Sequence, residues 1–176
     1  MKTRKLTLIS MLLVLAIIIF TVESQLPPLA PIPGIKLGLA NVINLMALYM
    51  LGRRESFTIL VLRIVLSSIF AGNFTGFMYS ISGGIICFLF MGVMSLFIKE
   101  NRMWVVSVFG AIGHNIGQII IACFIMGTFQ IIWYLPILMI SAIITGTFTG
   151  IAAQTALKHM RKTGIISKIT EDKNHA

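Results

Sequence analysis

The stretch PPLAPIPGIKLGLANVINLMALYML, Pro27–Leu51, holds four prolines and a lysine and leads directly into an apolar helix with two asparagines. An ordinary loop is less apolar, and an ordinary membrane helix does not begin with Lys36 and then hold Asn41 and Asn44. The run Leu37–Leu51 has 15 residues, roughly 22 Å of helix against a hydrocarbon core of about 30 Å. Because prolines lack N–H donors, we expect the preceding segment to form a partly sunken cap on the outer face of a membrane; a rigid interfacial linker is the alternative.

The composition of the whole chain favours a membrane protein. Of its 176 residues, 57% are apolar and only 11% are charged, against about 25% charged in a typical soluble domain. The net charge of +9 would suggest nucleic acid for a soluble protein, but membrane orientation signals also use Lys and Arg. Cys87 and Cys123 lie inside apolar runs, which favours two buried thiols over a disulfide.

Six apolar runs are long enough to predict an all-α membrane protein with six transmembrane helices. The first is longer than a typical signal-peptide core and is followed by no A-x-A cleavage site, so we interpret it as a span. The six runs form one transmembrane domain, residues 1–157, followed by a basic cytoplasmic tail, residues 158–176. The predicted spans are Leu6–Val22, Leu37–Leu51, Ser56–Ala71, Phe77–Ile98, Met103–Met126 and Leu135–Leu157.

The distribution of basic residues predicts how these spans are oriented. Twelve of the 14 Lys and Arg residues lie at the N-terminus, in the second and fourth connections and in the tail, which are alternate ends of the spans. The opposite side has only Lys36, and the remaining cation, Arg63, lies within a span. By the positive-inside rule, both termini are expected to be cytoplasmic and the proline-rich segment to face outward.

Several polar residues are predicted to lie near the membrane midplane or in its outer half. Arg63 is seven residues from the cytoplasmic end of its span, roughly 10–12 Å deep, and His114 is roughly 16 Å deep. An arginine at that depth must pair or face a wet cavity, whereas Asn41 or Gln118 alone would indicate an interhelical hydrogen bond. Glu23 is able to pair with either Lys36 or Arg63. Together these residues predict an outward-opening, net positive pocket for an anionic or carbonyl-rich ligand. Tyr79 and Ser80 are expected to be further residues of its wall. The predicted substrate-binding residues are Glu23, Lys36, Asn41, Asn44, Arg63, Tyr79, His114, Asn115 and Gln118.

Small-residue stripes accompany these polar residues. Gly110, Gly113 and Gly117 lie beside His114 on one predicted helix, where they allow either close helix approach or room for a ligand. The pairs Gly34/Gly38 and Gly146/Gly150 have the same small-xxx-small spacing, which is more often a packing feature.

Motifs for catalysis are missing from the sequence. There is no G-x-x-x-x-G-K-[ST] for ATP, and the single aspartate, Asp172, cannot supply the clustered carboxylates that hold Mg²⁺ on a diphosphate. No Cys/His cluster has metal-ligand spacing, and no Ser or Cys lies in a pattern typical of an activated nucleophile. We therefore expect no enzyme activity from this chain alone, no cofactor and no bound metal.

Three motifs carry a resemblance to a known family. They are E-x-x-L-P-x-x-A-P-x-P-G-I-K-L-G-L-A-N (Glu23 with Leu26–Asn41), LRIVL around Arg63, and G-H-N-x-G-Q at Gly113–Gln118. Together, over roughly residues 5–160, they resemble the family labelled heptaprenyl diphosphate synthase component I, also called Gx transporter proteins. That family is similar to the six-helix S components of energy-coupling-factor (ECF) vitamin transporters, which are membrane proteins of prokaryotes.

The resemblance implies two functions, and a third is open. S-component likeness implies a substrate-binding component of a transporter in the cell membrane, which captures a small molecule from outside and works with an ATPase and coupling-protein module. In that case Lys36 and Arg63 attract the negative end of the ligand. The family label implies a non-catalytic membrane partner of a prenyl diphosphate synthase subunit, or of a quinone- or flavin-linked redox system. The third is a structural helix bundle with a satisfied polar core.

Overall fold

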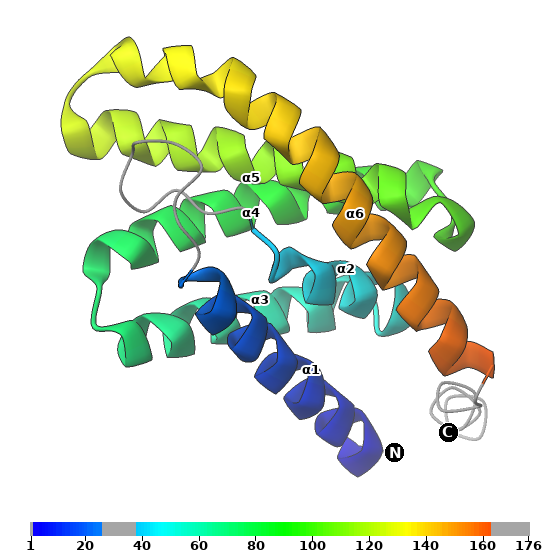
Figure 1. Cartoon of the computed structure of the whole chain (residues 1–176). Helices are drawn as coiled ribbons and strands as arrows, with labels where there is room; N and C mark the ends of the chain where they lie inside the picture. Colours follow the sequence, from blue (N-terminus) through cyan, green and yellow to red (C-terminus); the bar gives the residue numbers. More distant parts are fainter. Residues whose placement is uncertain (1, 26–37, 163–176) are drawn as a thin grey trace.

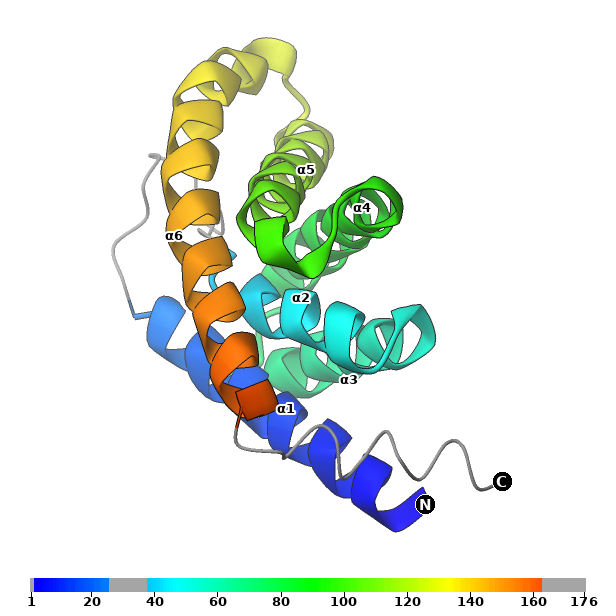
Figure 2. The same cartoon turned by 90° about the vertical axis from the view of Figure 1, so that its right-hand side faces the viewer.

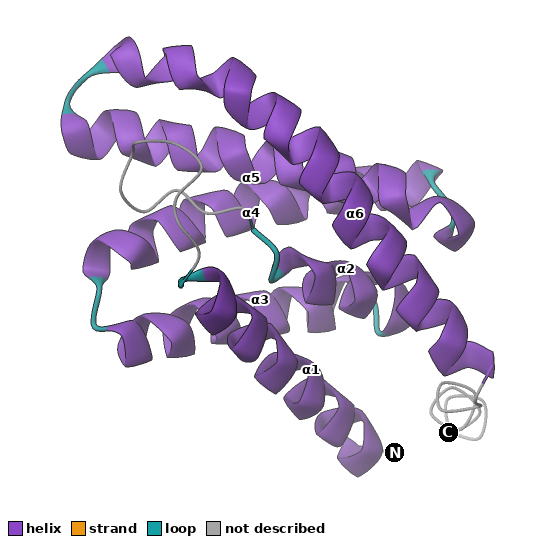
Figure 3. Ribbon diagram, in the orientation of Figure 1, coloured by secondary structure: helices purple, strands orange, loops and turns teal. Residues whose placement is uncertain are grey.

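The structure is a computed structural model that describes residues 2–25 and 38–162, and every element in these ranges is helical. The proline-rich segment with Lys36 and the tail from residue 163 onward lie outside the described residues. Figure 3 shows short connections between successive helices from α2 to α6. In chain order the elements are α1 (Lys2–Glu23), α2 (Asn41–Met50), α3 (Arg53–Ala71), α4 (Phe74–Phe97), the 3₁₀-helix η1 (Glu100–Arg102), α5 (Met103–Met126), the 3₁₀-helix η2 (Phe129–Tyr134) and α6 (Leu135–Lys162).

Each of the six predicted spans corresponds to one α-helix. The bounds of α5 are those predicted, while α4 begins three residues earlier than expected. The reason for the earlier start is local, because the Asn73 side chain caps α4 by accepting a hydrogen bond from the Gly76 N–H at 3.0 Å. At the other end of the chain α6 continues to Lys162, five residues beyond its apolar run. Hydropathy therefore located the helices, and capping and helix continuation set their ends.

Four helical segments are long and apolar enough to cross a membrane: Lys5–Glu23, Phe74–Phe97, Glu100–Met126 and Phe129–Lys162. Their outward faces are strongly apolar; on α6, Ile140, Ile144 and Phe148 are 62–75% exposed. Such a surface is unfavourable in water and suits lipid tails. This chain is therefore a membrane protein. The other two helices differ because α3 carries four charged residues and α2 has only ten residues.

The short helix α2 lies in the middle of the bundle, in contact with all five other α-helices (Figures 1 and 2). Seven of its ten residues are buried, including Ile43, Leu45 and Ala47. A helix that is apolar on nearly all sides is stable only when neighbours cover all of its faces. Its central position follows from that composition.

Close approach between helices depends on the predicted glycine stripes. A Cβ atom at Gly117 would lie 2.6 Å from the carbonyl oxygen of Ser82 on α4, and one at Gly150 would lie 2.4 Å from the Trp104 Cα on α5. Real Cβ atoms essentially never make contacts this short, so only glycine allows these backbones to pack as they do. Of the two alternatives for the Gly117 stripe, the structure therefore favours helix packing.

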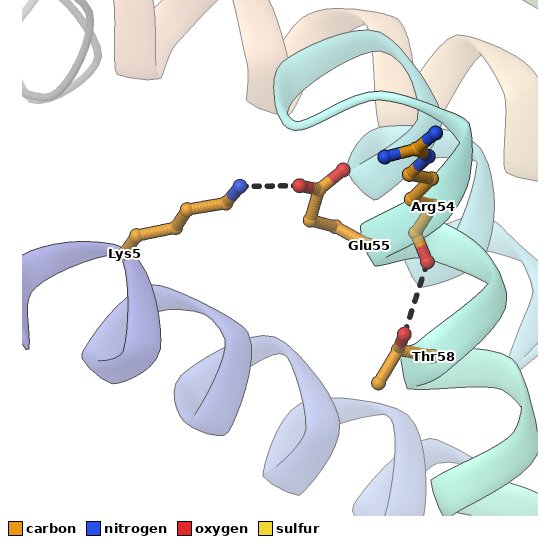
Figure 4. A network of polar contacts seen from close by, with 4 residues as sticks. All are labelled: Lys5, Arg54, Glu55 and Thr58. Atoms are coloured by element: carbon orange, nitrogen blue, oxygen red, sulfur yellow. Dashed lines mark hydrogen bonds and ion pairs between the residues drawn. The ribbon is translucent and has the colours of Figure 1, made fainter. Parts of the chain in front are cut away.

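The helix ends that carry basic residues lie together at one end of the bundle. Figure 1 shows the start of α1, the α2–α3 and α4–α5 connections and the end of α6 at this end. Two ion pairs join them: Lys5 of α1 with Glu55 of α3 (Figure 4), and Arg161 of α6 with Glu100 of η1 at 2.5 Å. Figure 4 also shows the Thr58 hydroxyl donating to the Arg54 carbonyl oxygen, a bond within the first turns of α3.

Candidate functional site

The candidate site is built around the turn that leads into α2. The N–H of Asn41 donates to the Gly38 carbonyl oxygen at 2.9 Å, which begins the helix. Gly38 has φ +77°, a left-handed conformation that side-chain-bearing residues rarely adopt. Its own N–H donates to the Oε1 of Glu23, the last residue of α1, at 2.5 Å. This hydrogen bond joins the end of α1 to the start of α2.

Arg63 of α3 lies beside this turn and is almost fully buried, with 3% of its surface exposed. Its guanidinium donates a long hydrogen bond of 3.5 Å to the Asn41 Oδ1 and lies 5.8 Å from the centre of the Phe20 ring, a cation–π distance. The Glu23 carboxylate interacts electrostatically with Arg63, and the Arg63 Nε has no hydrogen-bond partner among the described residues. A buried arginine with this few bonds retains capacity to bind an anion.

Glycines on α4 and before α2 bring His114 of α5 to the same place. Added Cβ atoms would lie 2.8 Å from the His114 ring at Gly83 and 2.9 Å from it at Gly38. The imidazole therefore fills the space between α4 and the turn, a space that exists because neither residue has a side chain. At Gly84, the next residue, an added Cβ would lie 3.0 Å from Ile64 and 3.1 Å from Leu60, so this glycine lets α3 approach α4 closely beside Arg63.

These side chains line a small hollow between α1, α3, α4 and α5. Its cavity volume is about 10 Å³, which is room for about one water molecule. Five of the predicted residues line it: Glu23, Arg63, His114, Gln118 and the predicted wall residue Ser80. Asn41 reaches it through its bond with Arg63. The complete lining is Phe20, Glu23, Gly38, Arg63, Ser80, His114 and Gln118.

A second hollow of the same volume lies on the other side of the α2 turn. In its wall the Ser107 hydroxyl of α5 lies 3.1 Å from the Thr149 hydroxyl of α6, and the hydrogen bond between them joins the two helices. Cys87 also lines it and is a buried free thiol, as predicted. Cys123 is free as well, but it is only partly buried, so the prediction of burial is wrong for Cys123. Its lining is Gly38, Asn41, Cys87, Met91, Ser107, Ala111, Thr145 and Thr149.

The remaining predicted site residues lie elsewhere. Asn44 is fully buried one turn further along α2, and neither amide atom of its side chain has a hydrogen-bond partner in residues 2–25 and 38–162. Asn115 faces α6, where its Nδ2 donates to the Leu138 carbonyl oxygen at 2.7 Å. Tyr79 packs in an apolar cluster on α4, α5, η2 and α6. Lys36 lies outside the described residues, and the assignment of all nine residues to ligand binding stays a prediction.

The sequence analysis did not single out Phe20, or the Ser107, Thr145 and Thr149 group. The spacing of these residues along their helices would have indicated both Phe20 and the threonine pair. Phe20 is three residues before Glu23 and so shares its face of α1, and Thr145 and Thr149 are four apart on α6. Within the described ranges, no group of three or more His, Cys, Asp or Glu residues is arranged to hold a metal ion.

Comparison with known proteins identifies the family. The family model for heptaprenyl diphosphate synthase component I matches residues 12–156, most of the chain and nearly all of the helical bundle. The comparison with curated proteins found no match. The comparison with solved structures found none either. The matched range contains all of the predicted site residues and the motifs that first suggested the resemblance, and the chain therefore belongs to the heptaprenyl diphosphate synthase component I family.

Proposed function

We propose that this protein is the membrane-embedded substrate-binding component of a transporter, similar to an ECF S component, and that it captures a small anionic or carbonyl-rich solute from the outer face. The observation that carries the proposal is Arg63, a buried cation whose guanidinium makes one long hydrogen bond within the described part of the chain, where its Nε has no partner. Placing such a group in a bilayer is unfavourable unless it has a function or a partner.

The architecture supports a multi-pass protein of the cell membrane with six spans and both termini in the cytoplasm. The basic helix ends lie at one end of the bundle, as the positive-inside rule requires of cytoplasmic ends. The polar hollow lies near Glu23 and Gly38, at the other end of α1 from the Lys5–Glu55 ion pair. In this orientation the hollow lies toward the outer ends of the helices, the side from which we propose that the ligand enters.

The lining groups suit a ligand with one negative end and several polar atoms. Arg63 supplies the charge for an anion, while Asn41 of α2 and His114 and Gln118 of α5 supply hydrogen-bonding groups from two other helices. Because the hollow as described holds about one water molecule, ligand binding requires the outer part of the bundle to open. A closed polar site with an entrance at helix ends is compatible with a binding component that alternates between two forms.

Ligand binding by purified protein tests this function. Small molecules that co-purify in detergent are identified by native mass spectrometry, and their affinities are then measured for wild type, Arg63→Met and Arg54→Met. Loss of a charge-assisted hydrogen bond weakens binding by about 10- to 100-fold, so Arg63→Met is expected to bind at least tenfold more weakly. Arg54→Met, which replaces an exposed arginine of the same helix, is the matched control and is expected to bind normally. Equal affinity of all three proteins would remove Arg63 from the site.

The family description favours one alternative, a non-catalytic membrane partner of a heptaprenyl diphosphate synthase. A partner of a quinone- or flavin-linked redox system is a second form of this alternative. In this function the protein would use the surrounding lipid phase to collect a long isoprenoid product. Affinity purification from the native membrane discriminates between the two functions. A soluble, aspartate-rich synthase in the purified complex supports the partner function, whereas two ATPases and a coupling protein support the transporter.

A further inference from the structure

The start of α2 has the properties of an anion site inside the bundle. With ten residues, α2 is about 15 Å long, about half of a 30 Å hydrocarbon core, so one of its ends lies at mid-depth. The N-terminal end of a helix carries a partial positive charge, and discontinuous helices in membrane proteins use it to bind anionic groups. The adjoining Gly38 N–H and the guanidinium of Arg63 both line the same hollow.

A carboxylate of the protein itself already interacts with this site. The Glu23 Oε1 accepts the Gly38 N–H at 2.5 Å, and its charge acts on Arg63. Glu23 is 4% exposed, so its negative charge offsets that of the equally buried arginine. Removal of the Glu23 carboxylate would take away the negative charge that acts on Arg63 and leave a buried charge uncompensated, which is strongly destabilising.

These contacts leave a ligand anion little room beside Glu23. The hollow holds about one water molecule, while a carboxylate bound by both Gly38 and Arg63 needs the space that the Glu23 side chain fills. If the carboxylate of the ligand replaces that of Glu23, a negative charge remains beside Arg63 and its positive charge stays compensated. Glu23 is the last residue of α1, where the helix ends in the turn at Ser24 and Gln25. Helix ends open at a lower free-energy cost than helix interiors, so the Glu23 side chain is able to move without unfolding α1.

We propose that the Glu23 carboxylate is a built-in occupant of the ligand's anion position, and that the transported solute is an organic carboxylate that displaces it from Gly38 and Arg63. This inference rests on the proposed function and gives the chemical class of its substrate. It assigns Glu23 a competitive function: the side chain stabilises the empty bundle and is released when the ligand carboxylate binds.

Chemical rescue tests the anion position without the natural ligand. Glu23→Ala removes the carboxylate, and acetate or propionate is added as the probe while thermal unfolding is followed in detergent. Acetate is expected to raise the Tm of Glu23→Ala by about 3–5 °C at ten times its dissociation constant, whereas chloride at equal ionic strength is expected to leave it unchanged. Glu55→Ala, which loses a carboxylate from the ion pair at the other end of the bundle, is the matched control and should not be rescued. The double variant Glu23→Ala/Arg63→Met should not be rescued either.

A second measurement covers the case in which Glu23→Ala does not fold. Glu23→Gln preserves the shape of the side chain but removes its charge, so a competing anion is expected to bind more tightly, by about tenfold for the co-purified ligand. Equal Tm shifts with acetate and chloride, or weaker binding by Glu23→Gln, would overturn the inference. If binding depends on Arg63 but neither variant behaves as expected, the inference fails and the transporter function stands. If acetate rescues Glu23→Ala but no solute binds through Arg63, the anion site stands and the transporter function fails.

Discussion

The substitution Gly117→Ala gives the most direct test of how the site is positioned. Gly117 lies on α5 between His114 and Gln118, two residues that line the hollow. A Cβ atom there would be 2.6 Å from the Ser82 carbonyl oxygen and 2.8 Å from the Gly83 Cα. Both are backbone atoms of α4, so no side-chain rotation relieves the contact. To restore an ordinary contact of 3.4 Å, the two helices would have to separate locally by about 0.8 Å.

The expected loss of stability follows from two opposing effects. Overpacking a close contact costs about 1–3 kcal/mol, and replacing glycine by alanine within a helix returns up to about 1 kcal/mol. Because the contacts are with backbone atoms that cannot rotate away, the cost lies in the upper part of this range, about 2–3 kcal/mol, and the net effect of Gly117→Ala is a loss of about 1–2 kcal/mol. Ligand affinity should fall with it because His114 and Gln118 shift with α5. Gly92→Ala on α4 is the matched control because an added Cβ there meets nothing within 4 Å. It should gain about 0.5–1 kcal/mol.

The assay is thermal unfolding in detergent micelles, followed by far-ultraviolet circular dichroism, for wild type and both variants. Gly117→Ala should unfold about 2–8 °C below wild type, and Gly92→Ala at or slightly above it. A Gly117→Ala variant as stable as Gly92→Ala would refute the close approach of α4 and α5, and with it the placement of His114 in the hollow.

Three further predictions concern single polar residues. Asn115→Leu removes the hydrogen bond to the Leu138 carbonyl oxygen and should lower stability by about 0.6–2 kcal/mol without changing ligand affinity, since the side chain faces α6; a fall in affinity at unchanged stability would contradict this. Asn44→Leu should raise the unfolding temperature because both amide atoms are buried without partners; a clear decrease would mean that they bind a partner. Lys5→Met breaks the ion pair with Glu55, which is partly exposed to solvent, and should change stability by less than about 1 kcal/mol in the same unfolding assay. A larger loss would show that this ion pair holds the two helices together.

Local pattern was enough to predict the helices because helix formation in an apolar environment depends on the run of residues itself. All six runs formed helices, and α5 has the predicted bounds. The sequence did not predict the 3₁₀-helix η2, since the predicted uncharged connection at Phe129–Tyr134 has no periodic pattern. It also gave no indication of the Lys5–Glu55 ion pair, which joins residues 50 positions apart.

The candidate site was partly predictable for a related reason. A polar residue in an apolar run is conspicuous whatever its neighbours are, so Arg63, Asn41 and His114 were identifiable from the sequence. Their partners were not, because the Asn41–Arg63 bond crosses 22 positions and depends on how α2 and α3 face each other.

The sequence by itself determined that this chain is a helical membrane protein of its family and which polar residues lie inside it. Tertiary structure alone decided which of them meet. His114 and Asn115 are adjacent in sequence, yet one reaches the hollow and the other bonds to α6, because successive residues of a helix point about 100° apart. The rotation of each helix is fixed by packing contacts, such as those of Gly83 and Gly117, that the apolar pattern along a single chain does not specify.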